Sequence, residues 1–299
     1  MGLDIEKKYS EDTGYDYEPL DLSQLDLEID VAHIEQYPNE QYTILRKHGL
    51  GTSDSSIVCG VNPYTTKYEL IEEKSRDYLT AEEKAVGDKT AVKKGRDLEP
   101  IIIKKHSVIM GKRILKPSDM YKHKDYPWLK FNFDGVVDKL DMGNGKYQYI
   151  PDEIKVVTAF GEKHYDRTKC WYREKLGFCN SQNIDIVKSN NSIVTKATLY
   201  GIPPYYYTQL QQQIFGLNAP YGYLTVLFDK DWELVSFFVP RDDATINYIL
   251  TEGYKTWQAI VNRTKDPMRD DVSELLKQFN AASTQVKKPN PLGAYEVIE

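Results

Sequence analysis

The segment FNFDGVVDKLDMGNGKYQYIPDEIKVV, residues 131–157, governs the fold prediction because it contains two runs of strand-forming residues around one turn. Residues 131–140 and 147–157 are rich in aromatic and β-branched side chains, which favour strands. The residues between them, DMGNGK, form turns readily, so we expect an antiparallel hairpin. Pro151 has no backbone N–H and therefore predicts a bulge or an edge position in the second strand.

Glu153 and Lys155 lie two residues apart in the second predicted strand. Successive side chains of a strand point to opposite faces, so this carboxylate and this ammonium should project from the same face. Asp134 lies in the first predicted strand, and hairpin pairing would bring it beside Glu153. Two neighbouring carboxylates repel each other unless a cation lies between them, and oxygen ligands of this kind suit magnesium or manganese. Glu99 offers a third carboxylate from a predicted helix.

Each of these features also has a common structural explanation. A Glu-x-Lys pair in a strand is usually a surface ion pair, an Asp-Gly dipeptide is usually a turn, and a helical glutamate is usually solvated. The prediction of a site therefore depends on several such motifs occurring together.

The remaining predicted elements complete a mixed α/β (α+β) fold in which helices flank a central mixed β-sheet. Hydrophobic spacing predicts helices over 67–79, 90–110, 205–217 and 242–261, and strands over 221–228 and 233–239. Pro100 would kink or begin the second helix, and Gly111 is placed to end it. Residues 158–202 follow neither pattern and are expected to be an insertion. The tyrosine run at 205–207 is expected to pack inside the protein rather than to stack on unpaired bases.

Charge is distributed unevenly along the 299 residues. Residues 1–40 contain 12 Asp and Glu against two Lys; subtracting these from 45 acidic and 39 basic residues leaves 33 against 37, a net charge of +4. We therefore expect an acidic N-terminal extension, 1–45, outside the core, and a mildly basic body that could contact phosphates. The extension would shield the basic face, dock a partner, or only improve solubility.

Cysteine usage and hydropathy exclude several classes of protein. Three cysteines without a C-x-x-C pair indicate neither a disulfide framework nor a thiolate metal site, as in a reducing cytoplasm. No apolar run is long enough to span a bilayer, and the first ten residues are charged where a signal peptide would be apolar. The five histidines form no metal-binding or HNH-like pattern. We expect a cytoplasmic protein without a membrane partner.

Six short motifs occur in order along the chain: Gly51-Thr52-Ser53-Asp54, Asn62-Pro63-Tyr64, Leu98-Glu99-Pro100, Asp134-Gly135, Glu153-Ile154-Lys155 and Tyr207-Thr208-Gln209-Leu210-Gln211. Together they resemble the YqaJ-like viral recombinases, to which lambda exonuclease is also similar, within the PD-(D/E)xK nuclease superfamily. The resemblance runs from residue 46 to residue 228 and implies a restriction-endonuclease-like core. We accordingly expect a nuclease domain at 46–262, with the insertion near 158–202 and a C-terminal tail at 263–299.

The resemblance implies particular roles in catalysis and metal binding. Asp134 and Glu153 would bind the metal ions with help from the Ile154 carbonyl, and Glu99 would bind or orient a second ion directly or through water. Lys155 would hold or deprotonate the attacking water. The implied cofactor is Mg²⁺ or Mn²⁺, with two ions per site, which suits phosphodiester hydrolysis because paired ions activate water and neutralise the phosphate.

Further residues are implied around the metals. Gln209 would position the Lys155 region or the scissile strand, the alternative being that it only hydrogen-bonds loops. Ser53 and Asp54 would lie near the DNA at the rim of the site. Arg46, seven residues before Ser53, occupies the place of an arginine that binds the DNA 5′-phosphate, unless it pairs with a nearby acid on the surface.

The function that the resemblance implies is a Mg²⁺-dependent deoxyribonuclease. It would be an exonuclease that degrades one strand of double-stranded DNA from an end, 5′ to 3′, and prepares single strands for phage-type recombination. Besides DNA, the implied partners are a single-strand annealing protein and further copies of the chain, commonly in a trimer. The resemblance also implies a phage or prophage origin and a bacterial host cytoplasm. Two alternatives stay open: an endonuclease or single-strand nuclease of the same fold, and a non-catalytic DNA-binding module.

Overall fold

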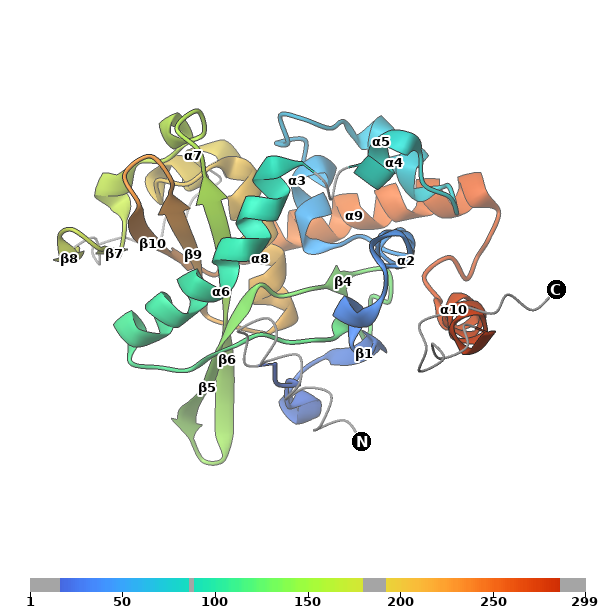
Figure 1. Ribbon diagram of the computed structural model, residues 1–299, viewed down its shortest axis with the longest axis horizontal. Coiled ribbons are helices and arrows are strands. Elements are labelled where there is room, and N and C mark those ends of the chain that lie inside the picture. Colours follow the sequence, from blue (N-terminus) through green and yellow to red (C-terminus); the bar gives the residue numbers. More distant parts are fainter. Residues whose placement is uncertain (1–16, 86–88, 180–191, 286–299) are drawn as a thin grey trace, which may run out of the picture.

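A seven-stranded mixed sheet organises the computed structural model, which describes residues 17–85, 89–179 and 192–285 (Figure 1). The strands follow the order β2-β5-β6-β9-β10-β7-β8. β6 and β9 run parallel, and every other neighbouring pair is antiparallel. The strand bounds are β2 Ile114–Leu115, β5 Gly135–Gly143, β6 Lys146–Val157, β7 Tyr172–Arg173, β8 Gly177–Phe178, β9 Tyr221–Phe228 and β10 Glu233–Pro240. The predicted fold, a central mixed sheet flanked by helices, is confirmed.

β5 and β6 form the predicted antiparallel hairpin, and residues 143–145 turn the chain with positive φ angles. The expectation that Pro151 marks an edge is wrong, because β6 lies between β5 and β9. The irregularity falls instead in the partner strand, where the register shifts after Val137. β6 is therefore a central strand, and its second half is largely buried.

The first predicted strand is divided between two sheets. A smaller sheet has the order β1-β3-β4, with bounds β1 Leu27–Val31, β3 Met120–His123 and β4 Lys130–Phe131. The chain leaves this sheet after β4 and enters the large sheet at Gly135. Asp134 is consequently the last residue before β5, at the junction of the two sheets.

Helices lie on both faces of β6 (Figure 1). On one face, His106 of α6 lies 2.6 Å from the Asp152 carboxylate, whereas α8 contacts the neighbouring Glu153 on the other face. α6 has the predicted bounds, with Pro100 inside it, and Gly111 ends it in the left-handed region at φ 59°. The helix bounds are α2 Asn39–Leu45, α3 Ser55–Val58, α4 Lys67–Lys74, α5 Ala81–Ala85, α6 Thr90–Met110, α7 Ile193–Leu199, α8 Pro204–Gly216, α9 Asp243–Thr264 and α10 Ser273–Gln285.

α4 ends five residues before its predicted end. Arg269, which is 2% exposed, donates hydrogen bonds to the carbonyl oxygens of Lys74 at 2.9 Å and Arg76 at 3.3 Å. In a longer helix, these carbonyls would accept hydrogen bonds from backbone N–H groups of the next turn. Here the guanidinium of Arg269, a residue far along the chain, donates to them instead.

Much of the expected N-terminal extension belongs to the core. Leu20, Leu25 and Leu27 are buried in the main hydrophobic cluster, and β1 pairs with β3. The prediction that residues 17–45 lie outside the core is therefore wrong, because their apolar side chains cover sheet surface despite the acidic composition around them. Residues 1–16 lie outside the described part of the chain.

The expected weakly structured tail contains the helix α10. Val272 is 3% exposed and packs in a second hydrophobic cluster with Val31 of the small sheet. Residues 286–299 lie outside the described part of the chain. Within the described ranges no helix is long and apolar enough to cross a membrane.

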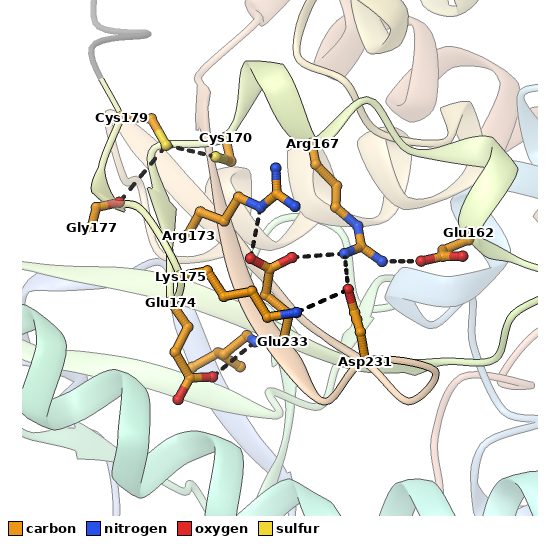
Figure 2. A network of polar contacts seen from close by, with 11 residues as sticks. Glu162, Arg167, Cys170, Arg173, Glu174, Lys175, Gly177, Cys179, Asp231 and Glu233 are labelled. Carbon is orange, nitrogen blue, oxygen red and sulfur yellow. Dashed lines mark hydrogen bonds and ion pairs between the residues drawn. The ribbon is translucent and has the colours of Figure 1, made fainter.

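Part of the expected insertion extends the large sheet. β7 pairs with β10 and β8 pairs with β7. A charged cluster fastens this segment to the sheet (Figure 2): the fully buried Glu233 of β10 accepts hydrogen bonds from Arg173 and Arg167, each at 2.7 Å. Arg167 also contacts Asp231 at 2.8 Å. Residues 180–191 of the expected insertion are not among those described.

Candidate active site

Three side chains, one from just before β5 and two from β6, converge on one cavity of about 380 Å³. Asp134 precedes β5, and Glu153 and Lys155 belong to β6, where their alternation puts them on one face. Glu153 is 1% exposed, whereas Asp134 and Lys155 are half-buried. The structure therefore brings these three predicted residues together.

Gly135 allows the strands to approach closely enough for this arrangement. A Cβ at this position would lie 3.0 Å from the Ile114 side chain and 3.3 Å from the Asp152 carbonyl oxygen. Gly135 pairs with Asp152 in the ladder, which brings Asp134 level with the Glu-Ile-Lys motif. The Asp134 carboxylate accepts a hydrogen bond from the backbone N–H of Ile154 at 3.2 Å. The Asp-Gly dipeptide thus serves a close strand contact rather than a turn.

The Lys155 ammonium gathers three oxygen atoms. Its Nζ lies 3.1 Å from Asp134 Oδ2 and 2.9 Å from the Ile154 carbonyl oxygen, and it forms an ion pair with Glu153 Oε1. The family resemblance assigns these same three groups to a metal ion. Two carboxylates and a carbonyl already arranged around a cation fit a hard divalent ion such as Mg²⁺ or Mn²⁺, which prefers oxygen ligands.

The acidic part of the site is small. Among residues 17–85, 89–179 and 192–285, no group of three or more His, Cys, Asp or Glu side chains is placed to hold an ion. The protein's contribution would be Asp134, Glu153 and the Ile154 carbonyl. This is sufficient for Mg²⁺, which usually keeps several waters and takes further oxygens from a phosphate substrate.

The charges of the cluster depend on one another. Burial and repulsion by Asp134 raise the pKa of Glu153 to about 7, against the opposing effect of Lys155. Burial also disfavours the ionised form of Asp134, but the ammonium groups of Lys155 and Lys116 hold its pKa below the ordinary value. Although burial disfavours the Lys155 ammonium, the two carboxylates raise its pKa well above the usual range. Positive charge is therefore needed here to keep both carboxylates ionised.

α8 presents two glutamines to Glu153. Gln209 donates from Nε2 to Glu153 Oε1, and Gln213 donates to Oε2 at 2.5 Å. Gln209 therefore lies at the predicted site, with the carboxylate as its partner, whereas Gln212 donates to the Leu50 carbonyl at 3.4 Å. Gln213 was not predicted as a site residue. The signal was its i, i+4 spacing from Gln209, which places both on one helix face.

Glu99 does not join the two carboxylates. Its Oε1 accepts an ion-paired hydrogen bond from Lys116 Nζ at 2.7 Å, and both side chains are 19% exposed. Lys116 in turn lowers the pKa of Asp134. Glu99 is thus paired with an ammonium that also acts on Asp134, and its role in binding or orienting a second ion, directly or through water, stays a prediction. Lys116 belongs to none of the sequence motifs, and no local pattern marked it.

Two of the three predicted DNA-contacting residues line the same cavity. Arg46 Nη2 donates to Ser53 Oγ at 3.1 Å, and the guanidinium lies 5.6 Å from the centroid of the Tyr42 ring. Asp54 is instead 9% exposed and pairs with Lys74 at 2.8 Å. The structure therefore places Arg46 and Ser53 in the lining of the cavity and gives Asp54 a structural contact.

Tyr206, from the tyrosine run that was expected to pack inside the protein, lines the cavity instead. The Lys155 ammonium lies 5.5 Å from the centroid of its ring, within range of a cation–π contact. The prediction of interior packing holds for the next residue, Tyr207, which is 1% exposed and donates to Asp242 at 2.7 Å. Helical spacing puts Tyr206 on the same side of α8 as Gln209 and Gln213.

The chain is similar to known proteins in sequence and in structure. The family model for the YqaJ-like viral recombinase domain matches residues 41–215, a range that contains Arg46, the carboxylates and both glutamines. An uncharacterized protein YqaJ from Bacillus subtilis (strain 168) is 26% identical over 262 residues, which cover 86% of this chain and 68% of that protein. An alkaline exonuclease (LHK-Exo) from Laribacter hongkongensis is similar in structure, with a TM-score of 0.45, 16% identity, and coverage of 80% of this chain and 96% of that one. Its complex with dAMP gives a TM-score of 0.46, 16% identity, and coverage of 81% and 97%. With the family model matching more than half of its length, the chain belongs to the YqaJ-like viral recombinase domain family.

Proposed function

We propose that this chain is a metal-dependent deoxyribonuclease that degrades one strand of double-stranded DNA from a 5′ end and so prepares single strands for recombination. The observation that carries the proposal is the convergence of oxygens from Asp134, Glu153 and Ile154 on the Lys155 ammonium. Oxygen ligands for a cation beside a fixed ammonium suit the hydrolysis of a phosphate ester, in which negative charge accumulates. Membership in a viral recombinase family supports the role in recombination.

Each site residue has a task in this proposal. A divalent ion, when bound, polarises the phosphoryl oxygens and makes nearby water more acidic. Asp134 and Glu153 provide its ligands, and the amides of Gln209 and Gln213 keep the Glu153 carboxylate from rotating. Lys155 holds positive charge where the phosphate would lie and orients the attacking water.

A non-catalytic DNA-binding module explains the site less well. Glu153 is 1% exposed and close to Asp134, and burial with this repulsion raises its pKa to about 7. A binding module gains nothing from burying a second carboxylate, which weakens attraction for DNA and costs stability. Strongly perturbed acids that line a cavity are instead typical of catalytic sites.

Duplexes labelled separately at the 5′ and 3′ ends test the proposal. With Mg²⁺, the 5′ label should appear first in the shortest products, while the 3′ label should stay on a strand that shortens gradually. EDTA should stop the reaction. Cutting of closed circular DNA would identify an endonuclease, and cutting of single strands alone would identify a single-strand nuclease.

Substitutions connect this activity to the site. Glu153→Ala and Lys155→Ala should each abolish cutting, while the circular dichroism spectrum and DNA affinity in EDTA stay near those of the wild type. Lys105→Ala is the matched control, because Lys105 also pairs with a glutamate, Glu174 at 2.8 Å, but at an exposed position. Full activity in either site variant sinks the proposal, and binding without any cutting by the wild type favours the non-catalytic module.

The proposal includes a homo-oligomer, a trimer by family resemblance, and a single-strand annealing protein as partner. Light scattering should then give a multiple of the 34.6 kDa chain mass, and the annealing protein should co-elute with the chain. A monomer with full, processive activity on long duplexes contradicts the oligomeric part of the proposal alone.

A further inference from the structure

A line of tyrosines runs from the candidate site toward solvent. Tyr206 lines the cavity, the centroid of the Tyr205 ring lies 4.6 Å from that of Tyr206, and the centroid of the Tyr64 ring lies 6.1 Å from that of Tyr205. Tyr205 and Tyr206 are half-buried, whereas Tyr64 is 75% exposed. We call these three rings the tyrosine ladder. It connects the protein surface to the group of residues proposed to act on the phosphate.

The ladder is held in place at both ends. Asn62 Oδ1 accepts hydrogen bonds from the backbone N–H groups of Tyr64 at 2.8 Å and Thr65 at 3.0 Å, and its Nδ2 donates to Ser56 Oγ at 2.9 Å. At the inner end, the ring centroid of Tyr165 lies 6.5 Å from that of Tyr206. A ring held by a fixed turn loses little conformational freedom when it binds a ligand.

The ring geometry suits bases that are not stacked on one another. The ring planes meet at 66° for Tyr64 and Tyr205 and at 61° for Tyr205 and Tyr206, so the rings do not cover each other's faces in parallel. The centroid steps of 4.6 and 6.1 Å exceed the rise of about 3.4 Å per nucleotide in a duplex strand. Bases inside a duplex have their faces covered by neighbours, whereas bases of an unpaired strand can stack on aromatic rings.

We propose that the tyrosine ladder is a binding subsite for unpaired nucleobases of the DNA strand next to the bond that is cut. This inference rests on the proposed nuclease function and adds to it the residues that hold the frayed strand. With a phosphate beside Lys155, the adjoining base lies nearest Tyr206 and Tyr205, and the next base outward meets Tyr64. The Asn-Pro-Tyr motif thereby gains a role, because Asn62 fixes the turn and Tyr64 offers its ring.

Binding of a short single strand in EDTA tests the ladder separately from cutting. We would measure fluorescence anisotropy of a labelled eight-nucleotide oligothymidylate at fixed salt. Tyr64→Ala and Tyr205→Ala should each weaken binding by on the order of tenfold, because each removes a stacking surface. Tyr64→Phe and Tyr205→Phe should bind within about twofold of the wild type, since both keep the ring. Tyr248→Ala is the control, because Tyr248 is a 47% exposed tyrosine of α9 outside the ladder.

Abasic positions locate the contact on the strand. In the wild type, removal of one base at a time should lower affinity at two or three adjacent positions and nowhere else. In Tyr64→Ala, the loss at the outermost of these positions should disappear, because the base has already lost its ring. Such coupling distinguishes stacking from a general change in the protein.

Either of two results overturns the ladder: Tyr64→Ala binds as tightly as the wild type, or the abasic series gives the same affinity at every position. If Tyr205→Ala lowers the thermal midpoint of unfolding, the binding of Tyr64→Ala is the deciding measurement. Tyr64 is exposed and its ring supports little packing, so this variant should fold normally. A wild type that binds but never cuts contradicts the nuclease and leaves the ladder standing. A wild type that cuts, with ladder variants that bind normally, contradicts the ladder alone.

Discussion

Gln213 Nε2 lies 2.5 Å from Glu153 Oε2, one helical turn from Gln209, which donates to the other oxygen of the same carboxylate. Glu153 thus accepts hydrogen bonds from two neutral amides, and its Oε1 also pairs with the Lys155 ammonium. These three contacts occupy three of the roughly four acceptor positions of the carboxylate and leave one, on Oε2. This orients it as a ligand before any ion arrives.

Replacement of Gln213 should therefore weaken metal binding more than it weakens the fold. In Gln213→Ala, we expect the dissociation constant for Mn²⁺ to rise by about tenfold to hundredfold, as is typical when a partner of a metal ligand is lost. Activity should fall at limiting Mn²⁺ and recover at high Mn²⁺. Gln212→Ala is the control, since Gln212 is equally buried on α8 but contacts a backbone carbonyl. Equal Mn²⁺ affinities in the two variants would show that Gln213 only packs.

The Glu99–Lys116 pair leads to a second prediction about metal binding. The Lys116 ammonium neutralises Glu99 and also lowers the pKa of Asp134. Lys116→Met removes this ammonium, so the site becomes more negative. We expect Mn²⁺ affinity, measured by electron paramagnetic resonance without DNA, to rise by on the order of tenfold. The double variant Glu99→Gln/Lys116→Met should return toward the wild-type affinity.

Lys105→Met provides the comparison for this experiment. It breaks a Lys–Glu pair of similar length, 2.8 Å, on the exposed side of α6 and should leave Mn²⁺ affinity unchanged. If Lys116→Met also leaves the affinity unchanged, Glu99 is too far from the ions to bind or orient one, directly or through water, as the family resemblance implies.

Buried His48 predicts a loss of stability in mild acid. Burial, helped by the charge of Arg269, lowers the pKa of His48 to about 4, below its ordinary 6.5. Between pH 6.5 and about 4, the His48 side chain is protonated in the unfolded chain but stays neutral in the folded chain. The folded state is therefore destabilised as the pH falls. The stability that depends on neutral His48 is fully present above pH 6.5. A pKa difference of this size corresponds to at most about 3 kcal/mol in the free energy of unfolding.

Urea denaturation between pH 7.5 and pH 4.5 measures this effect. In the wild type, the Arg269 carbonyl accepts a hydrogen bond from His48 at 2.7 Å. The side-chain amide of His48→Gln can donate to the same carbonyl but does not titrate, so the wild type should lose more stability than this variant across the pH window. His164→Gln, at an exposed position, should follow the wild type. Parallel curves for the wild type and His48→Gln would remove His48 as the cause.

Those parts of the fold and site that depend on local patterns were predictable from the sequence. Alternation along β6 put Glu153 and Lys155 on one face, and the hairpin turn brought Asp134 beside them. α6 has its predicted bounds because its periodicity and Gly111 both act within a few residues. These signals depend only on neighbouring residues, so no knowledge of the rest of the fold was needed.

Contacts between distant segments were not predictable in the same way. Arg269 ends α4 from almost 200 residues away, as the 195-residue separation from Lys74 shows, and no pattern near α4 indicates this. The acidic residues around Leu27 predict an extension outside the core. In the structure, however, β1 pairs with β3 and Leu27 is fully buried. Lys116 reaches Glu99 through tertiary packing alone. Composition describes a segment by itself, whereas burial depends on what packs against it.

The last prediction concerns the start of digestion and depends on Arg46. Its guanidinium shares the cavity with Asp134 and Lys155, and it donates to the Ser53 hydroxyl at 3.1 Å. Tyr42 and the carboxylates of Asp54 and Glu73 raise the pKa of Arg46 against the effect of burial, so the guanidinium carries its charge in the cavity. A terminal phosphate carries more charge than an internal diester, and a guanidinium can bind it through two parallel hydrogen bonds.

Arg46→Ala should therefore slow the digestion of 5′-phosphorylated duplex far more than that of 5′-hydroxyl duplex. Losing such a charge-assisted contact costs on the order of 1.5 to 3 kcal/mol, which corresponds to roughly tenfold to hundredfold in productive engagement. Arg46→Lys should recover only part of the preference, because an ammonium keeps the charge without the planar pair of donors. Ser53→Ala should have a smaller effect, since it removes only the hydroxyl that orients the guanidinium. If the wild type does not distinguish the two substrates, or if Arg46→Ala slows both equally, Arg46 does not bind the strand end, and the proposed 5′ to 3′ direction loses its only support from a named residue.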